Sequence, residues 1–266
     1  MPRLAWLTDL HLDFLDEKDV NELCNRVRAL SPDRLLVGGD TGEASTVMRW
    51  LGRLAGELEL PIDFVLGNHD YYGSQVGAVR HAASLAHTMN ARLGWLPSTG
   101  VVPLSEKAAL IGVDGWSDGR AGDWSASTVM LNDYLHIDDL VTHDKAERRR
   151  RLEALGDESA ARLAVLLDEA LARFTDVVVL THVPPFREAC WHEGKISNDD
   201  WLPHFTCVAT GEVLQSKARM HPDRRLTVLC GHTHSDGIVQ ISPNLVVHTG
   251  AARYGTPGTP MIFAVG

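Results

Sequence analysis

The segment Arg34-Leu35-Leu36-Val37-Gly38-Gly39-Asp40 is an apolar run that ends in two glycines and a carboxylate. Four or five apolar residues bounded by Gly or Asp are typical of a strand buried in a parallel sheet. The same pattern occurs at Arg3–Leu7 and at Asp63–Leu66. We therefore predict three buried strands, over these two segments and Arg34–Val37, each followed directly by polar residues.

Segments with helical spacing follow the three strands, over residues 17–30, 45–60 and 74–92. Strand–helix–strand alternation predicts a parallel sheet with right-handed crossovers. In parallel sheets, functional groups gather beyond the carboxyl ends of the strands. The polar residues that follow these strands should therefore meet at one edge of the sheet.

The remainder of the chain predicts a second set of strands and one long helix, over residues 144–174. The strands are expected at Val101–Leu104, Ala108–Val113, Asp176–Leu180, Thr227–Cys230, Ile238–Ile241, Leu245–His248 and Met261–Val265, the last three as antiparallel pieces. Two stretches, 114–142 and 183–206, show no clean period. We expect an α/β fold in a single domain, 1–266, with two sheets covered by helices and these stretches as insertions near the substrate.

Composition limits the function classes. The formal net charge is −10, from 35 acidic and 25 basic residues among 266, which disfavours a general nucleic-acid or anionic-membrane surface. A small phosphorylated substrate stays compatible, because metal ions can supply local positive charge. No export signal or membrane span is evident, and the four cysteines have no CxxC spacing. We therefore expect reduced thiols and a cytoplasmic location.

Five short motifs stand where predicted strands end. They are Asp9-Leu10-His11, Gly38-Gly39-Asp40, Gly67-Asn68-His69-Asp70, Thr181-His182 and Gly231-His232-Thr233-His234. In an extended segment, residues i and i+2 project to the same side, so the Asp and His of the first motif should point together, as should the two His of the last. The glycines permit tight turns and close backbone approach to a bound ion.

These motifs supply seven candidate metal ligands, namely Asp9, His11, Asp40, Asn68, His182, His232 and His234. Seven ligands exceed the three or four that one zinc ion accepts, which favours two metals. Nitrogen and oxygen donors without thiolate suit Zn, Mn or Fe(II). Two divalent ions exceed the charge of two carboxylates, which leaves positive charge for a phosphate oxygen and a hydroxide.

Each motif alone has a simpler reading. Asn68 could occupy a left-handed turn, Asp70 could cap the following helix, and His182 could be a buried hydrogen-bonded histidine. His69 could pack against the sheet edge, although a histidine beside a metal centre can also donate a proton or stabilise an oxyanion. The presence of all five motifs at strand ends favours the metal centre.

The five motifs together resemble those of the calcineurin-like metallophosphoesterase superfamily, over residues 9–234. The resemblance implies a four-layer αββα sandwich with the metals at the strand ends. It implies one metal held by Asp9, His11, Asp40 and His234, and another by Asn68, His182, His232 and a bridging Asp40. A hydroxide between the metals would attack phosphorus, His69 would contact the phosphate and protonate the leaving oxygen, and Asp70 would orient or tune His69.

The residues after Asp40 narrow the resemblance. Thr41-Gly42-Glu43 lacks the Asp-Arg-Gly of Ser/Thr protein phosphatases and dinucleoside tetraphosphatases, and no tyrosine follows where purple acid phosphatases place one. The motifs are more similar to the phosphodiesterase-like and small bacterial branches. We therefore expect a phosphate-ester hydrolase, with a phosphodiester somewhat favoured. A phosphomonoesterase or nucleotide phosphatase, a DNA nuclease and a non-catalytic metal-stabilised scaffold remain alternatives.

Substrate contacts are expected from the two insertions and from the segment after Asp70. Trp116 and Arg120 lie in one insertion, Arg187 in the other, and Tyr72 beside the third motif. His192 of the second insertion and Tyr254 are further candidates near the site, with packing the preferred interpretation for Tyr254. Aromatic and Arg side chains at the rim of a cleft could stack on a base or sugar and hold a second phosphate. The alternative for the tryptophans is a small satellite core. The oligomeric state and the natural substrate are not indicated by the sequence.

Overall fold

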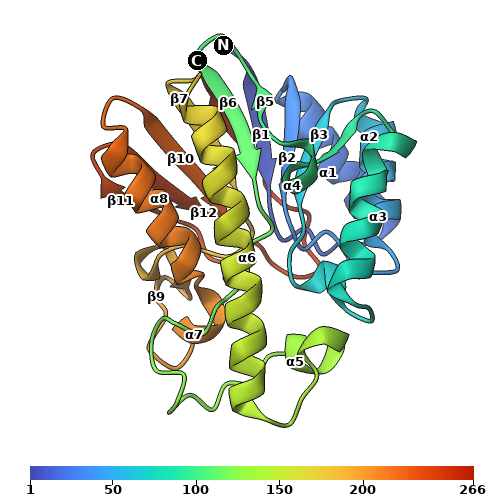
Figure 1. The fold of residues 1–266 in the computed structure, drawn as a ribbon. Helices are drawn as coiled ribbons and strands as arrows, with labels where there is room; N and C mark the ends of the chain where they lie inside the picture. The colour runs from blue at the N-terminus through green and yellow to red at the C-terminus, as the bar shows by residue number, and fades with distance from the viewer.

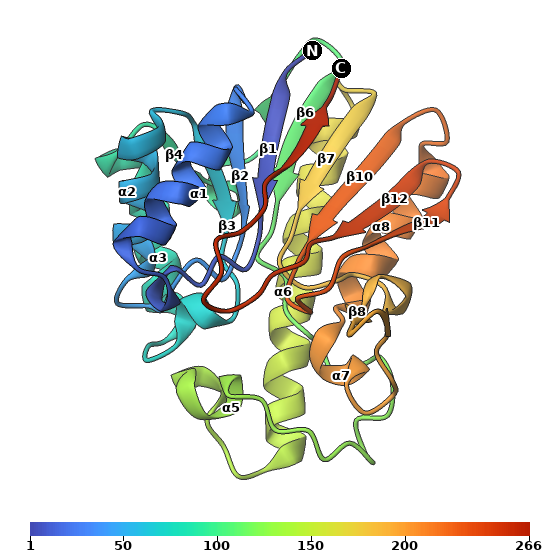
Figure 2. The ribbon, with the colours of Figure 1, turned by 180° about the vertical axis from the view of Figure 1, so that it is seen from behind.

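A computed structural model describes residues 1–266, and two sheets form its centre (Figures 1 and 2). The first sheet has the strand order β13-β1-β2-β3-β4. Its strands are β1 (Arg3–Leu7), β2 (Arg34–Gly38), β3 (Ile62–Val65), β4 (Leu93–Trp95) and β13 (Met261–Ala264). β1 to β4 are parallel, and β13 runs antiparallel to β1. The three predicted buried strands are confirmed, whereas the three-residue β4 was too short to be predicted.

The second sheet has the order β11-β12-β10-β7-β6-β5. Its strands are β5 (Val102–Pro103), β6 (Ala108–Gly112), β7 (Asp176–Leu180), β10 (Arg225–Cys230), β11 (Gly237–Ser242) and β12 (Leu245–Thr249). β6, β7, β10 and β12 are parallel, and the outermost strand at each edge is antiparallel to its neighbour. The predicted α/β class with two mixed sheets is therefore confirmed.

The prediction that the last three strands form antiparallel pieces is only partly correct. β11 pairs antiparallel with β12 and β13 pairs antiparallel with β1, as predicted, but β12 also runs parallel to β10, and β13 joins the other sheet. Residues 250–260 make the crossing between the two sheets, which Figure 2 shows as a long red loop. The sheet that a strand joins depends on partners far away in the sequence, and local apolar patterns do not encode them.

Helices cover the outer face of each sheet (Figure 1). The first sheet is covered by α1 (Glu17–Ala29), α2 (Val47–Leu58) and α3 (Val76–Met89), and the second by α6 (Lys145–Leu171) and α8 (Val208–Met220). The four predicted helices are confirmed within a few residues at their ends, and α8 is an addition. No helix in the structure is both long enough and apolar enough to cross a membrane.

The two inner faces of the sheets enclose a core of nine buried side chains. They are Leu4, Trp6, Leu36, Val65, Leu96, Leu110, Val178, Leu180 and Leu229. Alternation along a strand assigns the faces, because Leu4 and Trp6 of β1 point to this core while Ala5 and Leu7 point to the helices. The inner core holds the two sheets together and thereby fixes the relative positions of the motifs at their ends.

The two insertions lie together beyond the ends of the sheets (Figures 1 and 2). The first contains α5 (Asp133–His136), and the second contains β8 (Trp191–His192), β9 (Lys195–Ile196) and α7 (Leu202–Phe205). Backbone hydrogen bonds join them, from Asp118 N–H to Thr206 O (3.1 Å), and from Asp123 N–H to Asp199 O (2.8 Å). Shorter helical pieces complete the chain, namely α4 (Leu96–Thr99), η1 (Leu12–Phe14), η2 (His69–Tyr71), η3 (Asp138–Leu140) and η4 (Arg187–Ala189).

The inner core predicts a stability difference between two leucines. Leu110 of β6 is fully buried between the sheets, whereas Leu85 of α3 is 43% exposed. We expect Leu110→Ala to lower the free energy of unfolding by about 2–5 kcal/mol, because it removes buried methyl groups and leaves a cavity. Leu85→Ala, the matched control, should change it by about 0.5 kcal/mol or less. Urea unfolding followed by circular dichroism measures both, and equal effects would contradict the assigned inner core.

Candidate metal centre

Four motif side chains form a first donor group beyond the carboxyl ends of the strands. Donor atoms of Asp9, His11, Asp40 and His234 all lie within 4.8 Å of one another. His11 Nε2 is 3.1 Å from His234 Nε2 and 3.8 Å from Asp40 Oδ2, and His234 Nε2 is 3.4 Å from Asp9 Oδ1. Two carboxylates and two imidazoles around one point are a donor set that suits a divalent metal ion.

A second donor group adjoins the first and shares Asp40 with it. Asn68 Oδ1 lies 2.9 Å from His182 Nε2 and 2.9 Å from His232 Nδ1. His182 Nε2 is also 3.5 Å from Asp40 Oδ1. Asp40 thus presents one oxygen toward each group, as expected of a bridging ligand.

The hydrogen bonds of His182 and His232 indicate which nitrogen of each ring carries a proton, and therefore what the second donor group can bind. His182 Nδ1 lies 2.8 Å from Gly38 O, and His232 Nε2 lies 3.1 Å from His204 O. A carbonyl oxygen only accepts, so the hydrogen-bond network assigns the proton of each neutral ring to that nitrogen. The other nitrogen of each ring then directs a lone pair toward the Asn68 oxygen. Three converging lone pairs without a proton between them fit a bound cation.

Five of the seven predicted ligands have left-handed backbone conformations. The φ angles are 52° at Asp9, 43° at His11, 51° at Asp40, 70° at His232 and 58° at His234. Asp9 and His11 converge on the first donor group as predicted, whereas His232 and His234 belong to different donor groups. The geometric reason given for both pairs is corrected. β1 ends at Leu7 and β10 at Cys230, so these residues lie on tight loops instead of extended strand. Such strained conformations commonly mark functional sites.

Glycines let these loops approach one another, as predicted. A Cβ added to Gly67 would lie 2.2 Å from Asp40 Oδ1, and one added to Gly231 would lie 2.0 Å from Asp9 Oδ2. A Cβ added to Gly39, which has φ +93°, would lie 2.7 Å from His182 Nδ1. Any larger residue at these positions would displace a donor side chain.

With this geometry in view, comparison with known proteins identifies the family. The family model described as calcineurin-like phosphoesterase matches residues 2–236. The chain belongs to the calcineurin-like phosphoesterase family. It is accordingly a phosphoester hydrolase of the metallophosphoesterase class. The family uses divalent metals, and the Asp/His cluster is the place in this phosphoesterase that could bind one.

Several solved structures share the fold at low sequence identity. A phosphopantetheinyl hydrolase from Mycobacterium tuberculosis is 18% identical, with a TM-score of 0.65 over 96% of this chain and 90% of that one. A dimetal phosphatase from Danio rerio is 13% identical, with a TM-score of 0.60 over 97% and 90%. GAP50, described as the anchor in the inner membrane complex of Plasmodium, is 13% identical, with a TM-score of 0.51 over 96% and 76%. No curated protein matches the sequence.

Electrostatics in the phosphoesterase centre favours a bound cation. Burial and the carboxylates of Asp9 and Asp70 raise the pKa of Asp40. Burial alone would also raise the pKa of Asp9, but a hydrogen bond with His234 and the charges of nearby histidines lower it overall. Burial, with neighbouring histidines, lowers the pKa of His11 to about 3 and that of His232 to about 4, which keeps these rings neutral for coordination.

His69 lies beside the donor groups without joining them. Its Nε2 is 3.3 Å from the Tyr254 hydroxyl, its ring stacks on Tyr72 at 4.3 Å, and its backbone N–H donates to Asp40 Oδ1 at 2.8 Å. The 3-10 helix η2 begins at His69. The backbone of His69 thus bonds to Asp40, while its ring contacts Tyr72 and Tyr254. Tyr254 lies on the crossing between the two sheets.

Asp70 differs from its predicted role as the partner of His69. Its Oδ1 accepts hydrogen bonds from the N–H groups of Thr41 (2.8 Å) and Gly42 (3.0 Å), and its Oδ2 accepts one from Gly67 (2.8 Å). No hydrogen bond joins its carboxylate to the His69 ring, because both oxygens are engaged by the backbone. Asp70 therefore fastens the loop after β2 to the loop after β3.

Four of the seven candidate ligands, Asp40, Asn68, His232 and His234, line a cavity of about 250 Å³ together with His69. Of the four predicted substrate contacts, only Tyr72 lines it. Trp116 is buried against Tyr71. Arg120 pairs with Asp118 and Asp157, and Arg187 pairs with Asp199. These three predicted contacts are thus corrected: Trp116 belongs to the main core of the first sheet and its helices and not to the small satellite core of its alternative, and both arginines neutralise local carboxylates.

The remaining lining residues include two that the sequence offered as candidates near the site, His192 and Tyr254, and five that it did not indicate. Together they are Leu131, Asn132, Asp133, His192, Phe205, Thr233 and Tyr254. Six of them come from the insertions, the last motif or its vicinity, but no local pattern distinguishes them from other loop residues. The only sequence signal for most of them is their location in the two insertions or in the last motif.

The close glycine contacts predict how metal binding is lost. Gly67→Ala should displace the Asp40 carboxylate and lower the metal content, because the new methyl group would occupy the position of Oδ1. Gly77→Ala is the matched control, since Gly77 lies in α3 with no atom near its absent Cβ. Inductively coupled plasma mass spectrometry of both variants, with circular dichroism to confirm folding, measures the effect. Full metal content in folded Gly67→Ala would contradict the assigned geometry.

The lowered histidine pKa values predict acid sensitivity of the metal-free protein. Burial and nearby cations lower the pKa of His204 to about 4, and His11, His69 and His232 are lowered similarly. Unfolded histidines bind protons near pH 6.5, so the unfolded chain takes up more protons as the pH falls. The free energy of unfolding should therefore decrease from about pH 6.5 to about pH 4. Urea titrations in the presence of chelator measure it, and a flat profile would contradict the prediction.

Proposed function

We propose that this phosphoesterase holds two divalent ions, Mn, Fe or Zn, and hydrolyses phosphodiesters. The observation that carries the proposal is the pair of adjacent donor groups that share the Asp40 carboxylate. When bound, two such ions supply Lewis acidity and a nucleophilic water at neutral pH. Nitrogen and oxygen donors without a thiolate accept all three ions, so the metal identity depends on availability.

The residues of the chain orient the ester and handle its proton. In the hydrolysis, a water oxygen bonds to phosphorus, the ester P–O bond breaks, and the leaving oxygen takes up a proton. His69, which bonds to Tyr254 and lies outside both donor groups, is placed to donate that proton. Burial and the neighbouring His182 lower the pKa of His69 to about 4, and a phosphoryl anion beside the ring would act in the opposite direction.

Two aromatic walls support a diester over a monoester. Tyr254 contacts the first donor group, with ring centroids 4.4 Å from His11 and 5.0 Å from His234. Phe205 contacts the second group, with its ring 5.2 Å from His232. The walls thus flank opposite ends of the centre, and a diester has one organic group for each. A monoester would leave one wall without a contact.

The alternative of a non-catalytic scaffold has less support. The solved structure of GAP50 is described as an anchor and shares this fold, but fold likeness does not determine function. This chain keeps all seven candidate ligands and His69 in one site. The solved structure from Danio rerio is described as a dimetal phosphatase, and two bound metal ions are what we propose for this chain.

Hydrolysis tests the proposal directly. Purified protein loaded with Mn²⁺ and shown to contain two metals should cleave bis-p-nitrophenyl phosphate faster than p-nitrophenyl phosphate. The reason is the pair of organic groups in the diester, which both walls can contact. Faster cleavage of the monoester would reject the diester preference, and no cleavage of either compound would reject the proposed reaction.

The role of His69 is tested separately. His69→Ala should lower kcat by about 10²–10⁴-fold, the range for loss of a proton-transferring group, while its metal content stays at two ions. His143→Ala is the control, because His143 is exposed and remote from the cavity lining. If His69→Ala instead empties the site, His69 is a ligand and the assignment is wrong.

A further inference from the structure

The cavity over the donor groups contains no lysine or arginine. Its only charged side chain other than the ligand Asp40 and the histidines is Asp133. Arg120 and Arg187 of the insertions pair with carboxylates, and Lys145 at the start of α6 donates through Nζ to the backbone oxygens of Ser125 and Ser127. Lys195 of β9 is exposed and does not line the cavity. Among the lining side chains, positive charge can therefore come only from histidines or from a cation bound at the donor groups.

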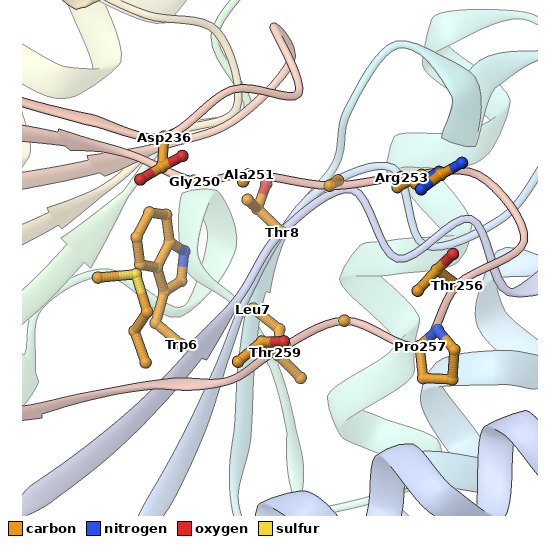
Figure 3. A pocket seen from close by; sticks show the side chains of 13 residues that line it. Trp6, Leu7, Thr8, Asp236, Gly250, Ala251, Arg253, Thr256, Pro257 and Thr259 are labelled. Atoms are coloured by element: carbon orange, nitrogen blue, oxygen red, sulfur yellow. The ribbon is translucent and has the colours of Figure 1, made fainter. Parts of the chain in front are cut away.

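Arg253 is a further basic residue close to the site in sequence, next to Tyr254. It lines a different cavity of about 440 Å³, between β1 and the crossing over residues 250–259. Figure 3 shows its side chain together with Thr256 and Pro257 on that crossing, across from Trp6. Arg253 is absent from the lining of the metal cavity. A second phosphate on a substrate would thus find no cationic partner among the lining side chains.

Asp133 has one engaged and one free carboxylate oxygen. Its Oδ1 accepts hydrogen bonds from Asn68 Nδ2 (2.8 Å) and from the Tyr72 hydroxyl (2.6 Å). Its Oδ2 has no hydrogen-bond partner in the protein and is not among the sealed polar atoms. Asp133 therefore fixes the Asn68 amide with one oxygen and offers an acceptor to the cavity with the other.

We propose that the cavity selects esters with a single phosphate, whose alcohol portion carries an ammonium or hydroxyl donor for Asp133 Oδ2. This substrate class rests on the proposed phosphodiester hydrolysis. A donor on the alcohol would satisfy the free oxygen, and an ammonium would also gain from its negative charge. A second phosphate would lie near that charge without a compensating cation, and like charges brought together at a binding site oppose binding.

Two matched pairs of p-nitrophenyl diesters test the selection in the Mn²⁺-loaded protein. The first pair is p-nitrophenyl phosphoethanolamine and p-nitrophenyl propyl phosphate, which differ by an ammonium in place of a methyl group. The second pair is thymidine 5′-(p-nitrophenyl phosphate) and the same compound with an added 3′-phosphate. We expect kcat/KM to be about tenfold higher for the ammonium ester and about tenfold lower for the doubly phosphorylated one.

Asp133→Asn separates recognition from positioning. The new Oδ1 can still accept from Asn68 and Tyr72, while an amide N–H₂ replaces the free oxygen. In this variant the two kcat/KM values within each pair should differ by no more than about twofold, because the charge and the acceptor that recognise the substrate are gone. Asp138→Asn is the control, since Asp138 is exposed on η3 and its side chain has no bond in the protein, and it should keep both ratios.

The outcomes separate the two proposals. Cleavage of all four esters with a preference for the doubly phosphorylated compound would overturn the inferred substrate class and leave the proposed hydrolysis standing. Ratios that Asp133→Asn does not change would also overturn it, because Asp133 would then only position Asn68. No cleavage of any ester by protein that contains two metals would overturn both.

Discussion

The carboxylate of Asp40 is buried at the junction of two donor groups, and the surrounding loops are arranged around it. One oxygen faces His11 and the other faces His182, while the backbone N–H of His69 holds the carboxylate in place. Burial beside other carboxylates is unfavourable for its charge, which a bound cation would offset. The close approach of Gly67 makes that arrangement sterically feasible.

The close approach of these loops requires strained backbone conformations, and contacts outside the donor groups stabilise them. Left-handed conformations at Asp9, Asp40 and His232 would be unstable in an isolated segment. Asp70 opposes the strain by binding the backbone N–H groups of two loops, and the inter-sheet core fixes the strands from which the loops emerge. The metal centre is therefore positioned by residues that are not ligands themselves.

The two insertions supply side chains that line the cavity beside the donor groups. Their backbones are hydrogen-bonded to each other, and His204 of one insertion accepts a bond from the ring of His232 through its carbonyl oxygen. Asp133 of the other insertion holds the amide of Asn68 and the hydroxyl of Tyr72, on which His69 stacks. The residues that line the cavity thus also contact the candidate ligands and His69, so the proposed substrate selection and the geometry of the donor groups depend on the same contacts.

The sequence by itself determined the α/β class, the three buried strands that precede the first motifs, and the Asp, His and Asn motifs that form the two donor groups. This was feasible because strands and ligand motifs are local patterns of apolar, glycine, Asp and His residues. It did not determine that β13 crosses to the first sheet, that Asp70 binds backbone, or that Arg120 and Arg187 point to carboxylates away from the cavity. Nor did it indicate Asp133 as a neighbour of the ligands. Those features depend on contacts between segments far apart in the chain, and a side chain in an irregular loop acquires its partners only when the tertiary structure brings the loops together.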